Sequence, residues 1–326
     1  MSTDLPVSLR TLGKTDIMIT PIGLGMMEFA GGQSGGLMSR AFPVITTEEK
    51  NATVKAALDG GINWFDTAEL YGGGNSEASL AAGLKAAGKA DRDVVVATKW
   101  WPLFRTSRNI PKTIDDRIRF LDGFSISLYM VHQPAGLSTH ESEMEAMADL
   151  VAAGKIRSVG VSNFSADQMR RCHATLQKRG LPLAVNQVQY SLLDRSIERN
   201  GILDTAKELG ITIIAYTPLA SGLLTGKYHK NPELLQKKFF FFRSRIQSNL
   251  EKSRPLVQAL EEIGNQYNAT AAQVALNWVI NGHGDTVVTI PGATKVRQAE
   301  ESAGAMKFKL SADEVARLNE LSIKLR

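Results

Sequence analysis

The sequence contains a single cysteine, Cys172, so no disulfide bond can form within the chain of 326 residues. Such sparing use of cysteine is typical of proteins from a reducing compartment. Cys172 lies in a helix-like run, and we expect it to pack in the core rather than to act as a nucleophile. No apolar stretch approaches the roughly 20 residues that span a bilayer. Residues 1–10 carry neither an apolar signal core nor an Arg-rich amphipathic pattern. We therefore expect a cytoplasmic protein without a membrane partner.

Long blocks of one charge are also absent. The chain has 38 basic and 33 acidic residues, a net charge of +5, and no basic run long enough for a nucleic-acid tail. We expect no nucleic-acid partner, although the small positive excess suits a small anionic ligand such as a phosphorylated cofactor. With 43% hydrophobic and 22% charged residues, the composition is that of a globular protein with a large core. We treat residues 1–326 as a single domain.

Eight short apolar runs alternate with longer amphipathic runs along the chain. The short runs are rich in Ile and Val and alternate little, which is typical of parallel strands buried on both faces. They lie at residues 19–26, 62–67, 94–99, 126–132, 156–162, 184–189, 212–217 and 286–290. Helical patterns lie at residues 48–58, 77–87, 113–121, 141–153, 166–177, 202–209, 255–280, 295–305 and 312–323. Eight strand-then-helix units predict a closed barrel or a long doubly wound sheet.

The third glycine of a dinucleotide-binding fingerprint is missing. A doubly wound dinucleotide-binding fold usually shows Gly-x-Gly-x-x-Gly after its first strand, whereas here Gly23 and Gly25 are followed by Glu28. We therefore predict an α/β protein with a (β/α)8 TIM barrel. A hairpin over residues 7–17 is expected to close the barrel floor, and extra helices are expected at the C-terminus.

Two stretches fall outside the repeating units. Residues 28–47 form a Gly-rich connection, which we expect to be a loop at the barrel mouth. Residues 220–251 form an insertion that contains four consecutive phenylalanines, residues 239–242. We favour a lid over a cofactor, with Arg243 or Arg245 reaching a phosphate. A contact with a second subunit or a plain hydrophobic anchor remains an alternative.

Four side chains suited to acid–base chemistry follow three neighbouring predicted strands. Asp66 and Tyr71 follow the second strand, Lys99 ends the third, and His132 ends the fourth. Lys99 lies 33 residues after Asp66, and His132 lies 33 residues after Lys99. The three residues therefore occupy equivalent positions on successive units. Because the C-terminal strand ends form the catalytic mouth of such barrels, we expect the four side chains to meet there.

Each of these four residues alone has an ordinary structural interpretation: a helix cap, a loop aromatic, a solvated rim charge or a core histidine. Their coincidence at one rim instead predicts a catalytic group. A free tyrosine has a pKa of about 10, and a nearby ammonium lowers the pKa of a phenol. We expect Lys99, held by Asp66, to lower the pKa of Tyr71. Tyr71 would then protonate a carbonyl oxygen oriented by His132, while a nicotinamide cofactor delivers hydride.

The sequence resembles the aldo-keto reductase family over nearly its whole length. The matching stretches are residues 65–72, 98–99, the strand around His132, 160–164, 186–191, 215–219, 222–228 and 290–295, with Gln298 and Glu301. The resemblance implies an NADP(H)-dependent oxidoreductase that reduces an aldehyde or ketone to an alcohol, with Asp66, Tyr71, Lys99 and His132 as its tetrad. The long insertion is similar to that of the bacterial, plant and potassium-channel β-subunit branch.

The resemblance also implies a set of cofactor-binding residues. Ser162, Asn163 and Gln187 would hold the carboxamide, and Tyr216 would stack on the nicotinamide. Lys295 and Arg297 offer positive charge to a 2′-phosphate at a helix N-terminus. Ser302 replaces the usual Asn, which implies weaker contacts with adenine. The full set is Gly25, Met26, Asp66, Ser162, Asn163, Gln187, Tyr216, Thr217, Pro218, Leu219, Ser221, Leu223, Lys227, Arg243, Ile290, Gly292, Thr294, Lys295, Gln298, Glu301 and Ser302.

Apolar residues near the predicted mouth are candidates for the substrate pocket. Met27, Phe29, Trp100 and Trp101 would favour an aromatic or hydrophobic carbonyl compound over a sugar. We assign no metal ligand. Two other functions remain open: a barrel that senses NADPH for a protein partner with little turnover, as in channel β-subunit relatives, and a lyase or aldolase with Lys99 as a Schiff-base amine. An oligomer is compatible with the sequence.

Overall fold

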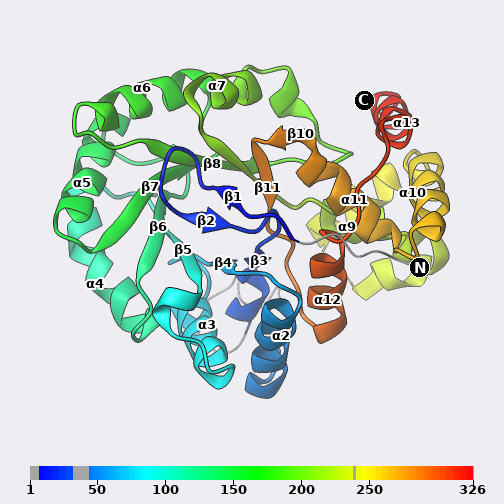
Figure 1. The fold of residues 1–326 in the computed structure, drawn as a ribbon, viewed down its shortest axis with the longest axis horizontal. Helices are drawn as coiled ribbons and strands as arrows, with labels where there is room; N and C mark the ends of the chain where they lie inside the picture. The colour runs from blue at the N-terminus through cyan, green and yellow to red at the C-terminus, as the bar shows by residue number, and fades with distance from the viewer. Residues whose placement is uncertain (1–6, 32–43, 238–239, 326) are drawn as a thin grey trace.

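A single parallel sheet forms the centre of the molecule. The computed structural model describes residues 7–31, 44–237 and 240–325. In these residues eight parallel strands pair in the order β11-β9-β8-β7-β6-β5-β4-β3. Bridges from Ile22 to Thr289 and from Gly25 to Gly292 join the two outer strands. The sheet therefore closes, and the predicted (β/α)8 barrel is confirmed (Figure 1).

The barrel strands match the predicted apolar runs, but the first is much shorter than expected. Their bounds are β3 (Leu24–Gly25), β4 (Trp64–Asp66), β5 (Val95–Trp100), β6 (Ile126–Val131), β7 (Ile156–Ser162), β8 (Leu183–Gln189), β9 (Thr212–Tyr216) and β11 (Val287–Thr289). The predicted strand at 19–26 is divided, because its first residue belongs to the hairpin strand β2 (Met18–Ile19). Pro21 follows, and proline has no backbone N–H to continue a ladder.

Helices cover the outside of the barrel (Figure 1). Those that follow the first six strands are α2 (Thr47–Asp59), α3 (Asn75–Ala86), α4 (Ile110–Leu121), α5 (His140–Ala152), α6 (Ala166–Gln177) and α7 (Ile202–Leu209). The predicted helix at 255–280 is instead two helices, α10 (Arg254–Gln266) and α11 (Ala271–Asn281). The break has a local cause, since Asn268 has a positive φ of 51° and Thr270 starts α11 with a capping box. A short strand, β10 (Gly282–Asp285), follows α11. The last helices are α12 (Val296–Gly304) and α13 (Ala312–Ile323).

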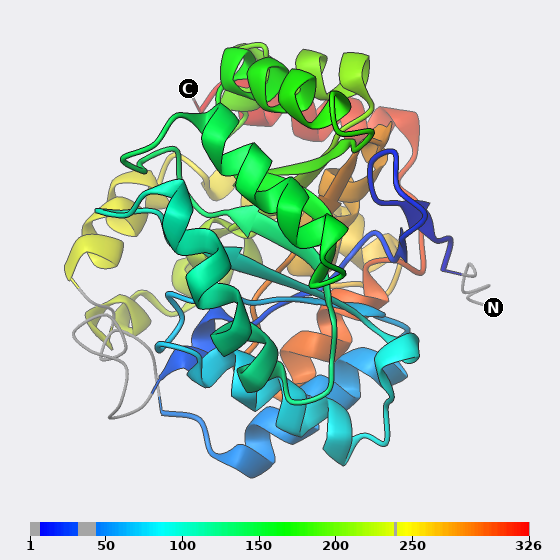
Figure 2. The same cartoon turned by 90° about the vertical axis from the view of Figure 1, so that its left-hand side faces the viewer.

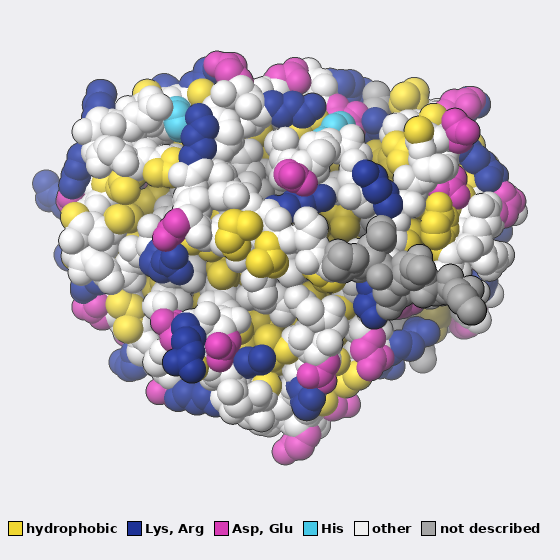
Figure 3. All heavy atoms as spheres, viewed as in Figure 1, with side chains coloured by type: hydrophobic (Ala, Val, Ile, Leu, Met, Phe, Trp, Pro, Cys, Tyr) yellow, Lys and Arg dark blue, Asp and Glu magenta, His cyan; other side chains and the backbone are white. Residues whose placement is uncertain are grey.

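The floor of the barrel is closed by the N-terminal hairpin, as predicted. Strands β1 (Arg10–Thr11) and β2 pair antiparallel, and Leu12, Ile17 and Ile19 pack with inward-facing residues of the barrel strands. The turn requires glycine, because Gly13 has a φ of +57° and a Cβ there would lie 2.4 Å from the carbonyl oxygen of Ala184. The hairpin crosses the centre of the view in Figure 1, and Figure 3 shows acidic and basic side chains interspersed on that face.

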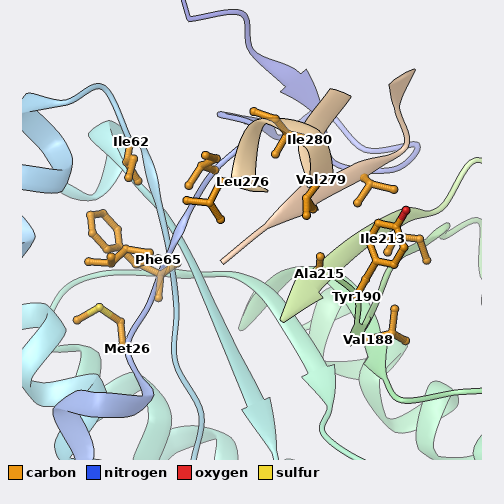
Figure 4. Close-up of a cluster of buried hydrophobic side chains, with 14 of the residues drawn as sticks. Met26, Ile62, Phe65, Val188, Tyr190, Ile213, Ala215, Leu276, Val279 and Ile280 are labelled. Carbon is orange, nitrogen blue, oxygen red and sulfur yellow. The ribbon is translucent and has the colours of Figure 1, made fainter. Parts of the chain in front are cut away.

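A second core fills the space between the strands and the helices. Part of it is seen in Figure 4, where Leu276 and Val279 of α11 lie near Ile213 and Ala215 of β9. The two cores follow from strand geometry, because successive side chains of a strand point to opposite faces. On β5, for example, Ala97 belongs to the inner core, whereas Val96 and Trp100 belong to the outer one.

The predicted insertion at 220–251 folds mainly as short helices on the side of the barrel opposite the N-terminal hairpin (Figure 2). They are η5 (Ala220–Thr225), α8 (Lys227–Lys230), η6 (Pro232–Lys237) and α9 (Phe240–Leu250). Leu223, Tyr228, Leu235 and Ile246 form a small core of their own. Residue 239 and the side chains of 240–242 and 245 lie outside what the structure describes, so the lid over the cofactor stays a prediction.

The Gly-rich connection after the first strand begins as a short 3₁₀ helix, η1 (Met27–Ala30). Most of the remainder of this connection, residues 32–43, lies outside the described residues. Among the helices of the described part of the chain, none combines the length and apolarity needed to cross a bilayer.

Candidate active site

The polar centre of the mouth is a buried ion pair. The Lys99 ammonium lies 2.5 Å from Oδ1 of Asp66 and also donates to the carbonyl oxygen of Thr67 at 2.9 Å. The Gln187 amide donates to the second oxygen of Asp66 at 2.9 Å. Lys99 is completely buried and Asp66 is 2% exposed. Burial raises the pKa of Asp66 and lowers the pKa of Lys99, and the attraction between the two charges opposes both shifts. Burying either charge without the other would cost several kcal/mol of free energy. Each group therefore depends on its partner to remain charged in this position.

Tyr71 is placed above this pair by a tight turn. The loop after β4 is closed by a hydrogen bond from the Ser76 amide to the Tyr71 carbonyl oxygen at 3.2 Å. Three glycines with positive φ, residues 72–74, allow the reversal. At Gly74 the fit is tight as well, since a Cβ would lie 2.4 Å from the ring of Phe120. As a result, the Lys99 ammonium lies 5.1 Å from the centroid of the Tyr71 ring.

The expectation that the pKa of Tyr71 lies below its ordinary value is wrong for this structure. Burial raises the pKa of the Tyr71 phenol well above its ordinary value, and the Asp66 and Glu28 carboxylates raise it further. The phenol is therefore protonated at neutral pH, which is the form that a general acid requires. The Lys99 ammonium lies 5.1 Å from the centroid of this ring, and a nearby cation favours the negative charge that a phenol acquires as its proton leaves.

His132 follows β6 and lies between two aromatic rings. Its ring is edge-on to Tyr71, with centroids 5.7 Å apart, and edge-on to Trp101, with centroids 5.2 Å apart. Burial, assisted by the charge of Lys99, lowers the pKa of His132 to about 3, so the imidazole is neutral. Its Nδ1 is buried and has no hydrogen-bond partner among the described protein atoms. A buried donor without a partner is costly, so we place the proton on Nε2, where it can donate to a carbonyl oxygen.

Two of the residues predicted for the substrate wall are not at the mouth. Trp100 is completely buried in the outer core, where its indole N–H donates to Asn109 Oδ1 at 2.9 Å. The reason is strand alternation: Lys99 points into the barrel, so its successor points outward. Phe29 is also fully buried in the outer core. The assignments of Trp100 and Phe29 to the wall are therefore wrong. Met27, which is 38% exposed, and Trp101 remain candidates.

A chain of hydrogen bonds connects the residues predicted for the carboxamide and the nicotinamide ring. The Tyr216 hydroxyl donates to Asn163 Oδ1 at 2.9 Å, and the Asn163 amide donates to Ser162 Oγ at 3.1 Å. The Ser162 hydroxyl in turn donates to the Gln187 carbonyl oxygen at 2.9 Å. These residues lie at the C-terminal ends of β7, β8 and β9, so the half-buried Tyr216 ring is held in place beside the buried ion pair.

The segment after β9 fits an anionic ligand. Thr217, Ala220, Ser221 and Gly222 all have positive φ, and such backbone conformations can turn amide groups toward a common concave site. The Lys227 ammonium lies against Gly222, since a Cβ on Gly222 would be 2.6 Å from Nζ. This arrangement fits the pyrophosphate of a dinucleotide. The side chains of Leu223, Met26, Pro218 and Ile290 are buried, and the assignment of these residues to the cofactor stays a prediction.

The predicted adenosine end lies at the start of α12. The Thr294 amide and hydroxyl both donate to Gln298 Oε1, at 2.8 and 3.1 Å. Lys295 is the N-cap residue of α12 and is exposed, as is Arg297. Ser302 is on the buried side of α12 and is 4% exposed, and its assignment to the adenine edge stays a prediction. Arg243 is exposed on α9.

Three charged residues at the mouth were not predicted. Glu28 lies against the cofactor-side strand end, since a Cβ on Gly292 would come within 2.3 Å of both its carboxylate oxygens. Glu69 and Arg105 form an ion pair at 2.6 Å beside Trp101. For Glu69 a signal was present, because it stands between Asp66 and Tyr71 in the same loop. Neither Glu28 nor Arg105 has a comparable sequence signal.

Comparisons with known proteins show the family of this chain. Residues 21–323 match the model of the aldo/keto reductase family. An aldo-keto reductase of Strobilurus tenacellus is 33% identical over 98% of this chain and 93% of its own length. An aldo-keto reductase of Schizosaccharomyces pombe, with NADP(+) in its name, is 33% identical over 84% of this chain and 83% of its own. A chloroplastic pyridoxal reductase of Arabidopsis thaliana is 32% identical over 93% of this chain and 84% of its own.

Solved structures show the same fold. A thermostable aldo-keto reductase in complex with the inhibitor epalrestat superposes with a TM-score of 0.76 at 30% identity, covering 96% of this chain and 99% of that one. An aldo-keto reductase of Klebsiella pneumoniae in complex with NADPH gives a TM-score of 0.74 at 25% identity, covering 97% and 95%. The chain belongs to the aldo/keto reductase family.

Proposed function

We propose that this protein reduces an aldehyde or ketone to the corresponding alcohol, with NADPH as the hydride donor. The observation that carries the proposal is the convergence of three groups at the mouth. The Tyr71 ring lies 5.1 Å from the Lys99 ammonium and is edge-on to the ring of His132. A phenol, a cation and a neutral imidazole are the groups that protonation of a carbonyl oxygen needs. A similar protein carries NADP(+) in its name, and a similar structure holds NADPH.

Each residue has a defined task in this reaction. When bound, the cofactor supplies hydride to the carbonyl carbon. The Nε2–H of His132 donates to the carbonyl oxygen and orients it toward Tyr71. The Tyr71 hydroxyl gives its proton to that oxygen as negative charge develops there. The Lys99 ammonium, kept in place by Asp66, stabilises the phenolate until solvent restores the proton.

Turnover tests the proposal directly. We expect oxidation of NADPH, measured by the loss of its absorbance, when 4-nitrobenzaldehyde is added. Tight NADPH binding with no oxidation of any aldehyde would instead identify a sensor that acts on a partner. A lyase would form a Schiff base, which borohydride traps as a covalent adduct. The complete burial of Lys99 against Asp66 predicts that no adduct forms on that residue.

The preference for NADPH is assigned to Lys295 and Arg297. Both are exposed at the start of α12, where the helix N-terminus and two cations suit a phosphate. A hydrogen bond to a charged group contributes about 1.5–3 kcal/mol. Lys295→Ala combined with Arg297→Ala should therefore weaken NADPH binding at least about tenfold while changing NADH binding little. The matched control is Lys85→Ala with Arg119→Ala, which removes two exposed cations from α3 and α4. Equal losses for both cofactors would refute the 2′-phosphate assignment.

A further inference from the structure

The Glu69 carboxylate joins three parts of the mouth. Its Oε2 accepts the backbone N–H of Trp101 at 3.0 Å, and its Oε1 accepts the Arg105 guanidinium at 2.6 Å. The Glu69 amide itself donates to the carbonyl oxygen of Lys99 at 3.1 Å. Glu69 thus ties the end of β4 to the loop that follows β5. Trp101 in that loop contacts the His132 ring, 5.2 Å between centroids, so the contacts of Glu69 reach the residue that we propose to orient the carbonyl.

The loop held by Glu69 contains a strained and exposed phenylalanine. The Arg105 amide donates to the Pro102 carbonyl oxygen at 2.9 Å, which closes a tight turn. Phe104, the third residue of that turn, has a φ of +58°, where glycine is normally found. Its side chain is 81% exposed. A bulky residue in this conformation persists only when its surroundings hold it, and the Glu69–Arg105 contact anchors the next residue.

The strained turn is one side of an apolar rim. The Leu137 amide, in the loop after β6, donates to the Arg105 carbonyl oxygen at 2.8 Å. Leu103, Phe104 and Leu137 are 40%, 81% and 68% exposed, and Trp101 of the same loop contacts His132. Exposed apolar groups gathered beside a site favour an apolar ligand. Arg105, a cation at this rim, is only 34% exposed on its side chain and already neutralised by Glu69.

We propose that Glu69 is a specificity-determining positioning residue. By neutralising Arg105 and fixing the 101–105 loop, it makes the pocket select uncharged carbonyl compounds with an apolar or aromatic body and reject those that carry a carboxylate. This proposal rests on the proposed function for its substrate. The carboxylate of a charged substrate would lie beside the negative charge of Glu69, which repels it. An apolar substrate would instead bury surface against Phe104 and Leu137.

The test compares two para-substituted aldehydes of similar size, 4-isopropylbenzaldehyde and 4-carboxybenzaldehyde. In the natural protein we expect kcat/KM to favour the isopropyl compound at least about tenfold. Glu69→Gln keeps an acceptor for the Trp101 amide but removes the negative charge, so Arg105 becomes available to a substrate carboxylate. The ratio should fall at least about fivefold, through a lower KM for 4-carboxybenzaldehyde rather than a higher kcat.

Two further variants separate charge from structure. Adding Arg105→Ala to Glu69→Gln should remove the gain for the carboxylate. Glu208→Gln breaks an arginine–carboxylate contact of the same 2.6 Å length on the barrel exterior, and it should leave the ratio unchanged. Equal losses for both aldehydes in Glu69→Gln would show a purely structural role and overturn the proposal, as would a natural preference for the carboxylate.

Binding distinguishes this proposal from the proposed function. If no aldehyde is reduced, the proposed reductase function is wrong. Calorimetric titration of both aldehydes into the NADP⁺-loaded protein still measures how tightly the pocket binds each of them. Tighter binding of 4-carboxybenzaldehyde to Glu69→Gln than to the natural protein, reversed by Arg105→Ala, supports the role of Glu69. An unchanged affinity contradicts it.

Discussion

The floor and the mouth of the barrel are built from the same strands but hold opposite kinds of groups. At the floor, Leu12 and Ile17 of the hairpin seal an apolar core around Trp64. At the mouth, the same inner face carries the buried charges of Asp66 and Lys99. Backbone strain divides in the same way. Of the seven non-glycine residues with positive φ in the described chain, five lie in the segments that follow barrel strands: Phe104, Asn163, Thr217, Ala220 and Ser221.

This division separates the part of the barrel that stabilises the fold from the part that destabilises it. The floor gains free energy from burial of apolar surface. The mouth holds buried charge and unfavourable backbone angles, which persist only because the surrounding structure holds them. In barrels of this kind the two ends are separate in function, and chemistry belongs to the C-terminal one. Substitutions at the two ends should therefore affect different measurements.

The largest expected effect is on activity alone. Tyr71→Phe removes the proton donor but leaves the ring over Lys99, so kcat should fall by at least the roughly 10²–10⁴-fold typical of a lost general acid. Steady-state rates measure this loss, and fluorescence titration should show NADPH affinity little changed. A parallel loss of NADPH binding would mean that Tyr71 has been assigned the wrong role.

Next comes the stability of the buried pair. Asp66→Asn leaves the Lys99 charge without its carboxylate, and breaking a buried pair costs about 3–5 kcal/mol of unfolding free energy. Urea denaturation measures the change. Asp285→Asn is the matched control near the floor, where Arg10 pairs with a carboxylate that is 86% exposed, and we expect a much smaller loss there. Similar losses at both sites would contradict the division between floor and mouth.

A floor substitution should show the reverse of Tyr71→Phe. Leu12 is 1% exposed in the hairpin turn, and Leu12→Ala should lower the free energy of unfolding by about 2–5 kcal/mol. Because the floor does not touch the reacting groups, kcat at a temperature where the variant is folded should equal that of the natural protein. A fall in kcat without a fall in stability would show that the two ends are coupled.

The smallest effect is a pH dependence of stability that originates at the mouth. His132 has a pKa of about 3 in the folded protein, against 6.5 for an ordinary histidine. Between these values the unfolded chain binds the extra proton, so this residue makes the folded state less stable as pH falls from about 6.5. From pH 7 to 5.5 the natural protein should lose about 1 kcal/mol more unfolding free energy than His132→Gln. Equal losses in both proteins would show that the imidazole titrates normally.

The sequence by itself determined the barrel, its closing hairpin and the positions of Asp66, Tyr71, Lys99 and His132. Parallel strands in a barrel are buried on both faces, so they read as apolar runs, and a constant spacing puts equivalent residues on one rim. Hydrophobic periodicity is local, which is why these features could be found without coordinates.

Only the tertiary structure decided which neighbours each of these groups meets. Strand alternation and loop packing sent Trp100 and Phe29 into the outer core and brought Trp101 to His132. The pKa of Tyr71 depends on burial and on carboxylates from β4 and η1, and the Glu69–Arg105 contact joins residues that are 36 positions apart. Burial and electrostatic interactions depend on distances through space. The distance between two loops cannot be obtained from their separation along the sequence.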